Sequence, residues 1–230
     1  GGLDDLRGFQ SQRLVVRPDG TSWLRDPLDV YLSSRCFDGV KTTFPYLVPH
    51  DSETREIVAD TVETHKVRRT VADLRYRIVQ PYEPFVAAGL KMMPLPVYHG
   101  GDMICNGYAF TIRGGKNRGD GDDHGDDEHL HVVYLFDISF MPNERLRYIQ
   151  ENLPPTDVLV VDCLRKTRTA ATHYNYQQAV ALVDTIRPKR VTYLVGMDCD
   201  DFYPHDEENR VIDATRPNVR FAHDGLVIEV

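Results

Sequence analysis

At 230 residues the chain is long enough for one large α/β domain with a sizeable core. Its content of 41% hydrophobic and 27% charged residues is typical of globular proteins and excludes a mainly disordered or fibrous chain. The net charge of −8 argues against a protein that grips long nucleic acids, because such proteins bind phosphates through basic stripes. One dense basic segment, residues 65–77, is interpreted as a solvated face.

The cysteines and the lack of long apolar segments indicate the compartment. Four cysteines are scattered along the chain without a C-x-x-C pair, which favours neither a zinc ribbon nor a disulfide framework. No apolar run reaches the roughly 18 residues of a membrane span, and no signal segment is recognisable at the start. We therefore expect a cytoplasmic protein without a membrane partner.

The first third of the chain predicts short elements separated by polar segments. Residues 3–9 have the pattern of a helix start, and a polar stretch around Trp23 follows. We expect a strand at 30–33, a helix that ends at 44–47 and a strand at 74–79. Residues 49–73 carry acidic residues three or four positions apart, which indicates an exposed helix or an ordered insertion.

The remaining residues predict strands followed by alternating helices and strands. Strands are expected at 90–97, 104–112 and 132–136, with the pattern of antiparallel sheets in a sandwich. Beyond them we expect helices at 143–151, 175–186 and 206–214, and strands at 157–161, 191–195, 219–222 and 226–229. This succession favours helices layered on sheets.

Residues 114–129 form a segment rich in glycine and aspartate. Its spacing partly imitates a calcium-binding loop, but His124 and His131 stand where oxygen ligands are required. We interpret the segment as a flexible acidic loop between two strands.

Three places carry residues suited to hydrolytic metal chemistry. His99 ends an apolar strand before two glycines, and Asp137 ends another strand that looks buried. His173 stands at a helix entrance near basic residues, where it could donate to a phosphate oxygen. Each histidine could equally be structural, and Asp162 has the same strand-end form as Asp137, so none of these patterns is specific by itself.

Seven strings occur in an order that resembles a known family: GLDDLRG, FPYLV, GLKMMPLPVYHG, YLFDISFMP, DVLVVDCLR, THYNYQQAV and AHDGLVIEV. Together they are similar to the metallo-β-lactamase-fold phosphodiesterases that include the bacterial phosphonate-operon cyclic phosphodiesterase and its eukaryotic relatives. The match covers most of residues 1–10, 30–48 and 85–230.

The resemblance implies an α/β fold, the four-layer αββα sandwich, with two divalent ions, Mn²⁺ or Zn²⁺. By position, His99 matches a metal ligand, Asp137 matches the carboxylate that bridges the metals, and His173 matches a histidine that assists cleavage without binding metal. Asp4 and Asp5 match an acidic pair to which we assign a role at a helix start.

The chain departs from the family pattern in two places. The last metal-binding histidine is absent where the sequence has Gly196, so we expect His205 to replace it, in preference to Cys199, because imidazole suits manganese as well as zinc. The alternative is that His205 merely begins a helix. The H-x-H-x-D-H motif that precedes GLDDLRG in the family does not occur either.

The resemblance therefore implies a single domain over 1–230, incomplete at the N-terminus, that lacks the first strands and the first metal-binding motif. Because that motif supplies about half of the metal ligands, its segment is expected as a partner, without which this chain should bind metal poorly.

The function expected from the resemblance is metal-dependent hydrolysis of a small cyclic nucleotide or sugar phosphate. Two alternatives remain: a nuclease like the transfer-RNA 3′-processing enzymes, or a non-catalytic binding module of the same fold. The acidic charge disfavours the nuclease, and the retention of His99, Asp137 and His173 disfavours the module. Phe140, Met141 and the 49–73 segment offer a surface for a homodimer.

Overall fold

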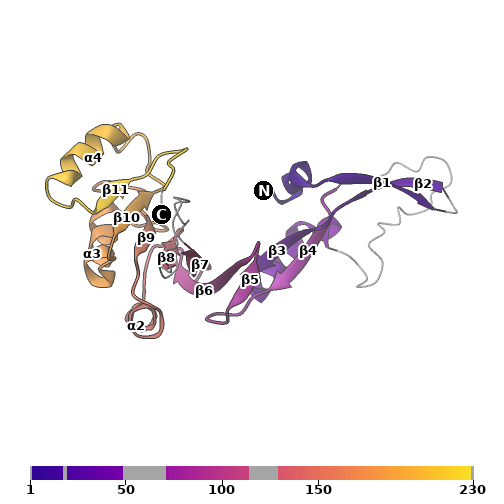
Figure 1. Cartoon of the computed structure of the whole chain (residues 1–230), viewed down its shortest axis with the longest axis horizontal. Coiled ribbons are helices and arrows are strands. Elements are labelled where there is room, and N and C mark those ends of the chain that lie inside the picture. Colours follow the sequence, from indigo (N-terminus) through magenta and orange to yellow (C-terminus); the bar gives the residue numbers. More distant parts are fainter. Residues whose placement is uncertain (1, 18–19, 49–70, 114–128, 229–230) are drawn as a thin grey trace, which may run out of the picture. The chain divides into compact units, whose positions relative to one another are not determined.

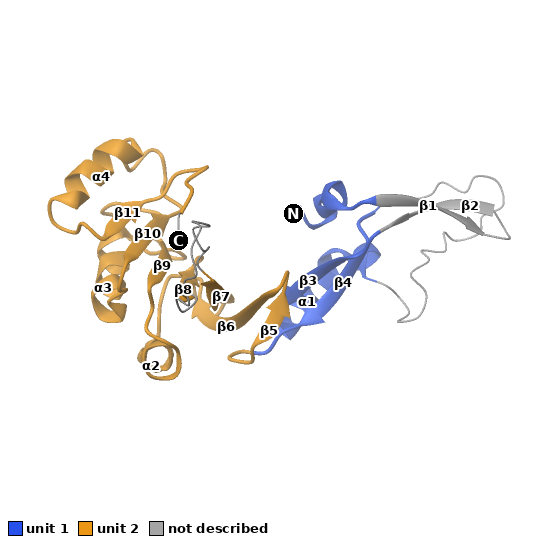
Figure 2. Ribbon diagram, in the orientation of Figure 1, with its two compact units in different colours: residues 1–80 blue, residues 81–230 orange. Residues whose placement is uncertain are grey.

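The computed structural model describes residues 2–17, 20–48, 71–113 and 129–228, with the side chains of residues 12–25 left undescribed (Figure 1). The chain divides into two compact units, residues 1–80 and residues 81–230 (Figure 2). The expectation of one domain over 1–230 stays a prediction.

The first unit contains two small sheets and short helices. A 3₁₀ helix, η1 (Leu3–Phe9), is followed by the antiparallel strands β1 (Gln12–Arg17) and β2 (Gly20–Arg25). Strand β3 (Leu28–Leu32) pairs in parallel with β4 (Leu74–Ile78), and helix α1 (Ser34–Thr43) and the 3₁₀ turn η2 (Pro45–Leu47) follow β3 in the chain.

Local interactions explain why these elements begin where they do. The Ser33 side chain caps α1 by accepting a hydrogen bond from the backbone nitrogen of Cys36. Asp4 and Asp5 lie in the first turn of η1, where we expected them, and the Asp4 carboxylate also accepts a 3.0 Å hydrogen bond from the backbone nitrogen of Ala72. This bond ties η1 to the residues just before β4.

The second unit is built on a seven-stranded sheet in the order β11-β10-β9-β8-β7-β6-β5. Its strands are β5 (Phe85–Ala87), β6 (Leu90–Tyr98), β7 (Ile104–Arg113), β8 (His129–Leu135), β9 (Val158–Asp162), β10 (Val191–Val195) and β11 (Val219–Phe221). The neighbours from β5 to β8 pair antiparallel, whereas those from β8 to β11 pair in parallel. Parallel neighbours need crossover segments, which contain α2 (Asn143–Asn152), α3 (Tyr176–Ile186) and α4 (His205–Asp213).

One continuous apolar cluster joins the strands to the helices. Leu135, Val161 and Leu194 are fully buried in it and come from three adjacent strands. The helices add buried residues to the same cluster, among them Ile149, Ala179, Leu182 and Ile212. The parallel half of the sheet is therefore anchored by its helices, and its strand ends are held at fixed positions.

Most of the predicted elements are confirmed within one or two residues, but some expectations were wrong. The strands expected at 90–97, 104–112 and 132–136 pair antiparallel, as expected, but the same sheet also contains the later strands β9 to β11, which pair in parallel. Residues 226–228 form no strand, because the chain turns at Gly225, where φ is +81°, and Leu226 donates a backbone hydrogen bond to His223 instead. The hairpin of β1 and β2 and the short strand β5 were not predicted.

Two further predictions fall largely outside the described residues. The 49–73 insertion is described only from residue 71, and the 114–129 loop only at His129, which begins β8. Among the helices of the described part, none is both long and apolar enough to cross a membrane.

Candidate metal and phosphodiester site

His99 follows β6 and is oriented by the loop before α3. Its Nδ1 lies 2.8 Å from the backbone oxygen of Thr172, an acceptor, so we assign the proton to Nδ1. In this tautomer Nε2 carries the lone pair that a metal ion requires. The tight approach depends on Gly100, because its φ is +78° and an added Cβ would lie 2.7 Å from the Thr172 methyl group.

Asp137 follows β8 in a backbone conformation that L-residues rarely adopt. Its φ is +52°, and such strain in a residue other than glycine is often found at functional sites. Two residues later, Ser139 binds the loop after β6: its backbone nitrogen donates to the Tyr98 oxygen at 2.7 Å, and its Oγ accepts from the Gly100 nitrogen at 2.8 Å. These bonds hold the ends of β6 and β8 together.

His173 is oriented by Asp162, the last residue of β9. Its Nδ1 lies 2.7 Å from the Asp162 Oδ2, which also accepts a 3.2 Å hydrogen bond from the backbone nitrogen of Ile138. Asp162 is 0% exposed, and among the described residues its other oxygen, Oδ1, has no hydrogen-bond partner. Burial raises the pKa of Asp162 above the ordinary carboxyl value, and the hydrogen bond from His173 partly offsets this shift.

The three predicted residues meet at one edge of the sheet. Possible ligand atoms of His99, Asp137 and His173 all lie within 4.8 Å of one another. The two imidazole rings have centroids 4.8 Å apart at an angle of 78°, and the His173 Nδ1 lies 3.9 Å from the Asp137 Oδ1. The His99 imidazole and the Asp137 carboxylate are donors that suit zinc or manganese, so these two residues fit a divalent ion, with His173 beside them.

His205 is not part of this group in the described structure. It is the first residue of α4, as the alternative interpretation expected, and its ring lies 6.2 Å from that of His223. Its role as a metal ligand stays a prediction. Cys199, the other option, is exposed and lies in a separate group with Asp198 and Asp200.

In the family that the sequence resembles, the last metal-binding histidine is expected at the position of Gly196. The φ of Gly196 is +77°, and an added Cβ would lie 3.0 Å from the Phe136 ring and 3.3 Å from the Asp162 Oδ1. A side chain here would therefore disturb the residue that orients His173.

Cations close to the site are already paired with acidic residues. Arg165 forms an ion pair with Asp198, Lys166 with Glu208, and Arg168 with Asp201 at 3.3 Å. The Asp201 carboxylate also accepts a hydrogen bond from the backbone nitrogen of Lys166, which is the main reason that its pKa is lowered.

Asp162 and Ser139 are functional candidates that the sequence did not single out. Asp162 ends a buried strand, but Asp137 has the same kind of sequence position. The position alone does not show that Asp162 contacts His173. The residues around Asp137 also give no indication that Ser139 forms hydrogen bonds with Tyr98 at the end of β6 and with Gly100.

No family model matches the chain, and no curated protein matches it. Several solved structures are similar over most of it, and three of them are described here. A diphosphatase of the PhnP family matches with a TM-score of 0.61 and 23% identity, covering 100% of this chain and 66% of that one. YhfI from Bacillus subtilis, a metallo-β-lactamase-fold protein, matches with a TM-score of 0.52 and 16% identity over 89% of this chain and 64% of that one. Yeast PDE1 matches with a TM-score of 0.53 and 12% identity, covering 87% of this chain and 59% of that one.

The chain thus spans slightly less than two thirds of the length of these structures. At such identities the likeness concerns the fold, and it agrees with the family resemblance of the sequence. The chain has the metallo-β-lactamase fold.

Proposed function

We propose that the protein is a metal-dependent hydrolase of phosphodiesters whose substrate is a small cyclic nucleotide or sugar phosphate. The observation that carries the proposal is the convergence of His99, Asp137 and His173, each oriented from a different strand end or loop. A purely structural role would not require two imidazoles that each turn Nδ1 toward an acceptor and leave Nε2 for another partner.

The roles that we propose for the side chains come from the family resemblance, and the close approach of the three residues supports them. His99 and Asp137 would hold two divalent ions, Mn²⁺ or Zn²⁺, together with further ligands. Such ions supply Lewis-acid polarisation of the phosphoryl group and activation of water. His173 would donate from Nε2 to the leaving oxygen, and Asp162 would balance the positive charge that this donor form carries.

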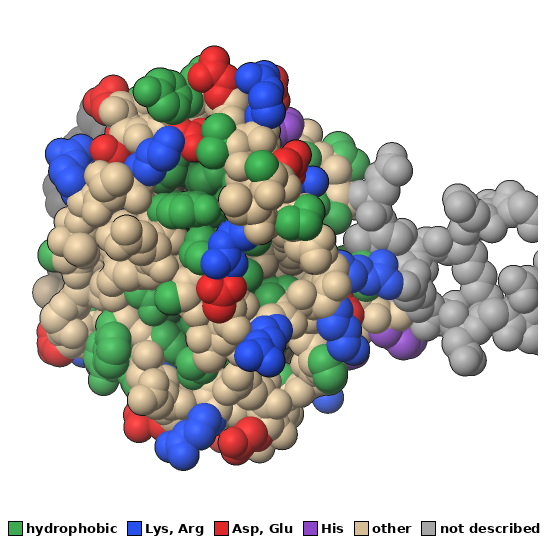
Figure 3. Space-filling model, turned by 90° about the vertical axis from the view of Figure 1, so that its left-hand side faces the viewer, with side chains coloured by type: hydrophobic (Ala, Val, Ile, Leu, Met, Phe, Trp, Pro, Cys, Tyr) green, Lys and Arg blue, Asp and Glu red, His purple; other side chains and the backbone are tan. Residues whose placement is uncertain are grey.

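The charges around the site support a substrate with a single phosphodiester. The three nearby cations are engaged by carboxylates, so they offer little attraction to a diphosphate or a long polyanion. Basic side chains on the face shown in Figure 3 are spread out and interspersed with acidic ones. Nucleic-acid grooves concentrate positive charge, so the net charge of −8 and the pairing of these three cations disfavour a transfer-RNA-processing nuclease.

The test is hydrolysis of 2′,3′-cyclic AMP by the protein expressed from its complete coding sequence, with added Mn²⁺ or Zn²⁺ and with a chelator as control. We expect metal-dependent turnover that His173→Ala lowers about 100- to 10,000-fold, the usual contribution of a general acid. Cleavage of precursor transfer RNA alone would favour the nuclease. Absence of turnover on both substrates would favour the non-catalytic module.

A further inference from the structure

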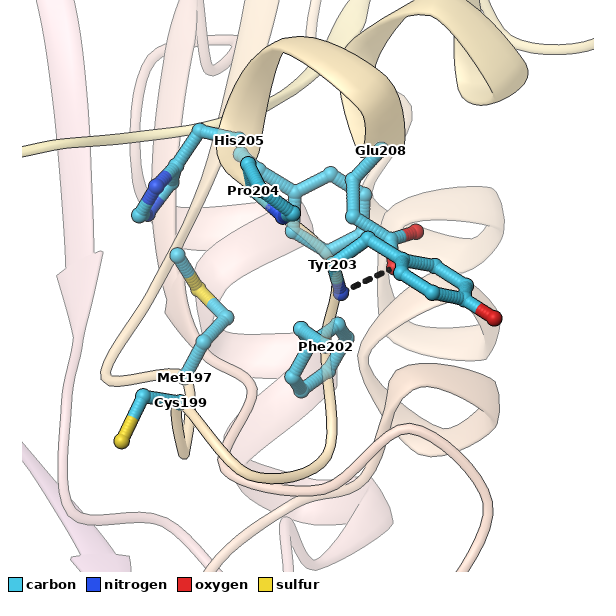
Figure 4. Close-up of a pocket in the computed structure, with 8 residues that line it drawn as sticks. Met197, Cys199, Phe202, Tyr203, Pro204, His205 and Glu208 are labelled. Carbon is cyan, nitrogen blue, oxygen red and sulfur yellow. Dashed lines mark hydrogen bonds between the residues drawn. The ribbon is translucent and has the colours of Figure 1, made fainter.

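A pocket of about 300 Å³ lies beside the site, entirely within the second unit. This volume is at the lower end of the range for small-molecule pockets, roughly 300–1,000 Å³, so it can hold one part of a small ligand. Figure 4 shows Met197 and His205 on one side of it, and Glu208 hydrogen-bonded to the backbone nitrogen of Tyr203. Its lining is Met197, Cys199, Phe202, Tyr203, Pro204, His205, Glu208 and Phe221.

The sheet register places this pocket close to the Asp162–His173 pair. Strands β9, β10 and β11 are parallel, so their carboxyl ends share one edge of the sheet. Asp162 lies opposite Val195, two residues before Met197, and Phe221 lies opposite Leu194. With about 4.8 Å between strands, the pocket wall begins roughly 5–10 Å from Asp162. In α/β proteins ligands bind at this edge of the sheet.

The walls offer aromatic and apolar surface without an unpaired charge. Phe202 and Phe221 contact each other with ring centroids 5.5 Å apart, and Met197 adds a polarizable thioether. Glu208 is the carboxylate in the wall, and it is buried and paired with Lys166. The Lys166 ammonium lies 4.9 Å from the centroid of the Tyr203 ring, which adds a cation–π contact.

We propose that this pocket binds the nucleobase of the substrate, so that the phosphodiester is a cyclic nucleotide rather than a sugar phosphate. A flat, neutral ring can stack on the aromatic side chains of this pocket, whereas a sugar offers no flat face to these rings and a second phosphate would meet the Glu208 carboxylate. A base is also separated from its phosphate by a ribose, which suits the distance between the pocket and Asp162. The inference rests on the proposed function, because it assigns a subsite to the same reaction.

A second apolar surface near the site makes the proposal testable against an alternative. Met103, Ile104 and Phe140 are exposed beside His99, and the Tyr98 ring lies 6.1 Å from that of Phe140. A base could stack on this open surface instead. Each of the two surfaces carries one methionine, so methionine methyl groups distinguish them.

The first experiment is an NMR titration of the protein, labelled with ¹³C at the methionine methyl groups, with adenosine. We expect the ring current of the base to shift the Met197 resonance in a saturable manner and to leave Met103 unchanged. Tyr203→Ala should weaken this binding about 10-fold, the size expected when one base–aromatic stack is lost. A shift of Met103 without Met197, or no shift of either, would overturn the proposal.

The second experiment compares KM for 2′,3′-cyclic AMP with KM for glycerol 1,2-cyclic phosphate, which has no base. Tyr203 is 68% exposed, so Tyr203→Ala should fold normally. It should raise KM about 10-fold for the nucleotide and leave the base-free KM unchanged. Val211→Ala is the matched control, because Val211 lies on α4 at 71% exposure and does not line the pocket.

The two hypotheses fail in different ways. If adenosine shifts the Met197 resonance but neither cyclic phosphate is hydrolysed, the assignment of the pocket to a base is supported and the proposed function is refuted. If both are hydrolysed with equal sensitivity to Tyr203→Ala, the function stands and the base subsite is refuted.

Discussion

Replacement of Asp162 by asparagine isolates the charge that orients His173. A single carboxylate oxygen, Oδ2, accepts both the His173 and the Ile138 hydrogen bonds, whereas Oδ1 has no partner among the described residues. The amide oxygen of Asn can take the Oδ2 position and its NH₂ group the Oδ1 position. The geometry should therefore persist while the negative charge disappears.

The expected effect on activity can be estimated from this contact. The 2.7 Å hydrogen bond changes from a charge-assisted to a neutral one, and the positively charged donor form of His173 loses its counterion. Partners that orient the histidines of metal sites typically contribute 10- to 100-fold, and we expect the loss of the Asp162 charge beside such a site to lower kcat/KM by about the same factor. This is about 1.4–2.7 kcal/mol of transition-state stabilisation, at 1.36 kcal/mol for each factor of ten.

Stability should respond in the opposite direction from activity. Burial raises the pKa of Asp162, so the ionised carboxylate is disfavoured in the folded protein and its removal relieves that cost. We expect the melting temperature of Asp162→Asn at pH 8 to equal or exceed that of the wild type. A lost fold would lower activity and stability together, whereas this reasoning requires activity alone to fall.

The assay is steady-state hydrolysis of 2′,3′-cyclic AMP with saturating metal, accompanied by thermal unfolding. Asp157→Asn is the matched control, because Asp157 stands just before β9, is also buried, and accepts a 2.9 Å hydrogen bond from the backbone nitrogen of His131 at the opposite end of the strand. It should leave kcat/KM unchanged. An unchanged kcat/KM in Asp162→Asn, or an equal loss in both variants, would refute the role assigned to Asp162.

Three further predictions concern the same region and its core. First, the folded protein binds the Asp162 proton more tightly than the unfolded chain does, because burial raises the pKa of Asp162. The contribution of Asp162 to the free energy of unfolding should therefore fall as the pH rises from the ordinary carboxyl pKa through the raised value. In urea unfolding, the difference in stability between the wild type and Asp162→Asn should change over this pH range and stay constant outside it. Second, Gly100→Ala should cost about 1–3 kcal/mol of backbone strain and also lower the metal content of the protein. Gly89→Ala is the control, because Gly89 has a similar φ of +82° but open space around it, and it should leave the metal content unchanged. Equal metal content in the two variants would contradict the packing role of Gly100. Third, burial raises the pKa of Cys163 to about 12, whereas Cys199 is exposed. Iodoacetamide at pH 8 should therefore alkylate Cys199 in the native protein and leave Cys163 unmodified, which peptide mass mapping would measure. Rapid alkylation of Cys163 would indicate that the core opens.

The strand-end positions of His99 and Asp137 could be predicted from the sequence, whereas their role as metal ligands comes from the family resemblance and stays a prediction. His99 and Asp137 follow strong apolar strands, and parallel or neighbouring strands bring their ends to one edge of the sheet. The partnership of Asp162 with His173 could not be read in the same way, because it depends on the path of the loop between β9 and α3. Local strings do not specify which side chain such a loop returns to.

The failures in predicting the fold have similar physical causes. The β1–β2 hairpin was hidden by polar residues, although the Pro-Asp-Gly sequence that ends at the first residue of β2 is a typical turn signal. The strand expected at 226–229 had an apolar pattern, but Gly225 directs the chain away from β10 after the last backbone bond between Ala222 and Leu194. Apolar alternation alone does not say whether an edge is available for pairing.

Metal content tests the central claim most directly. The protein expressed from its complete coding sequence would be dialysed against Mn²⁺ or Zn²⁺, freed of excess ion, and measured by elemental analysis together with intact mass, as wild type and as His99→Ala. We expect about two ions per chain in the wild type, as in two-metal hydrolytic sites, and the loss of at least one in the variant. A metal-free wild type, or equal metal content in both proteins, would contradict it.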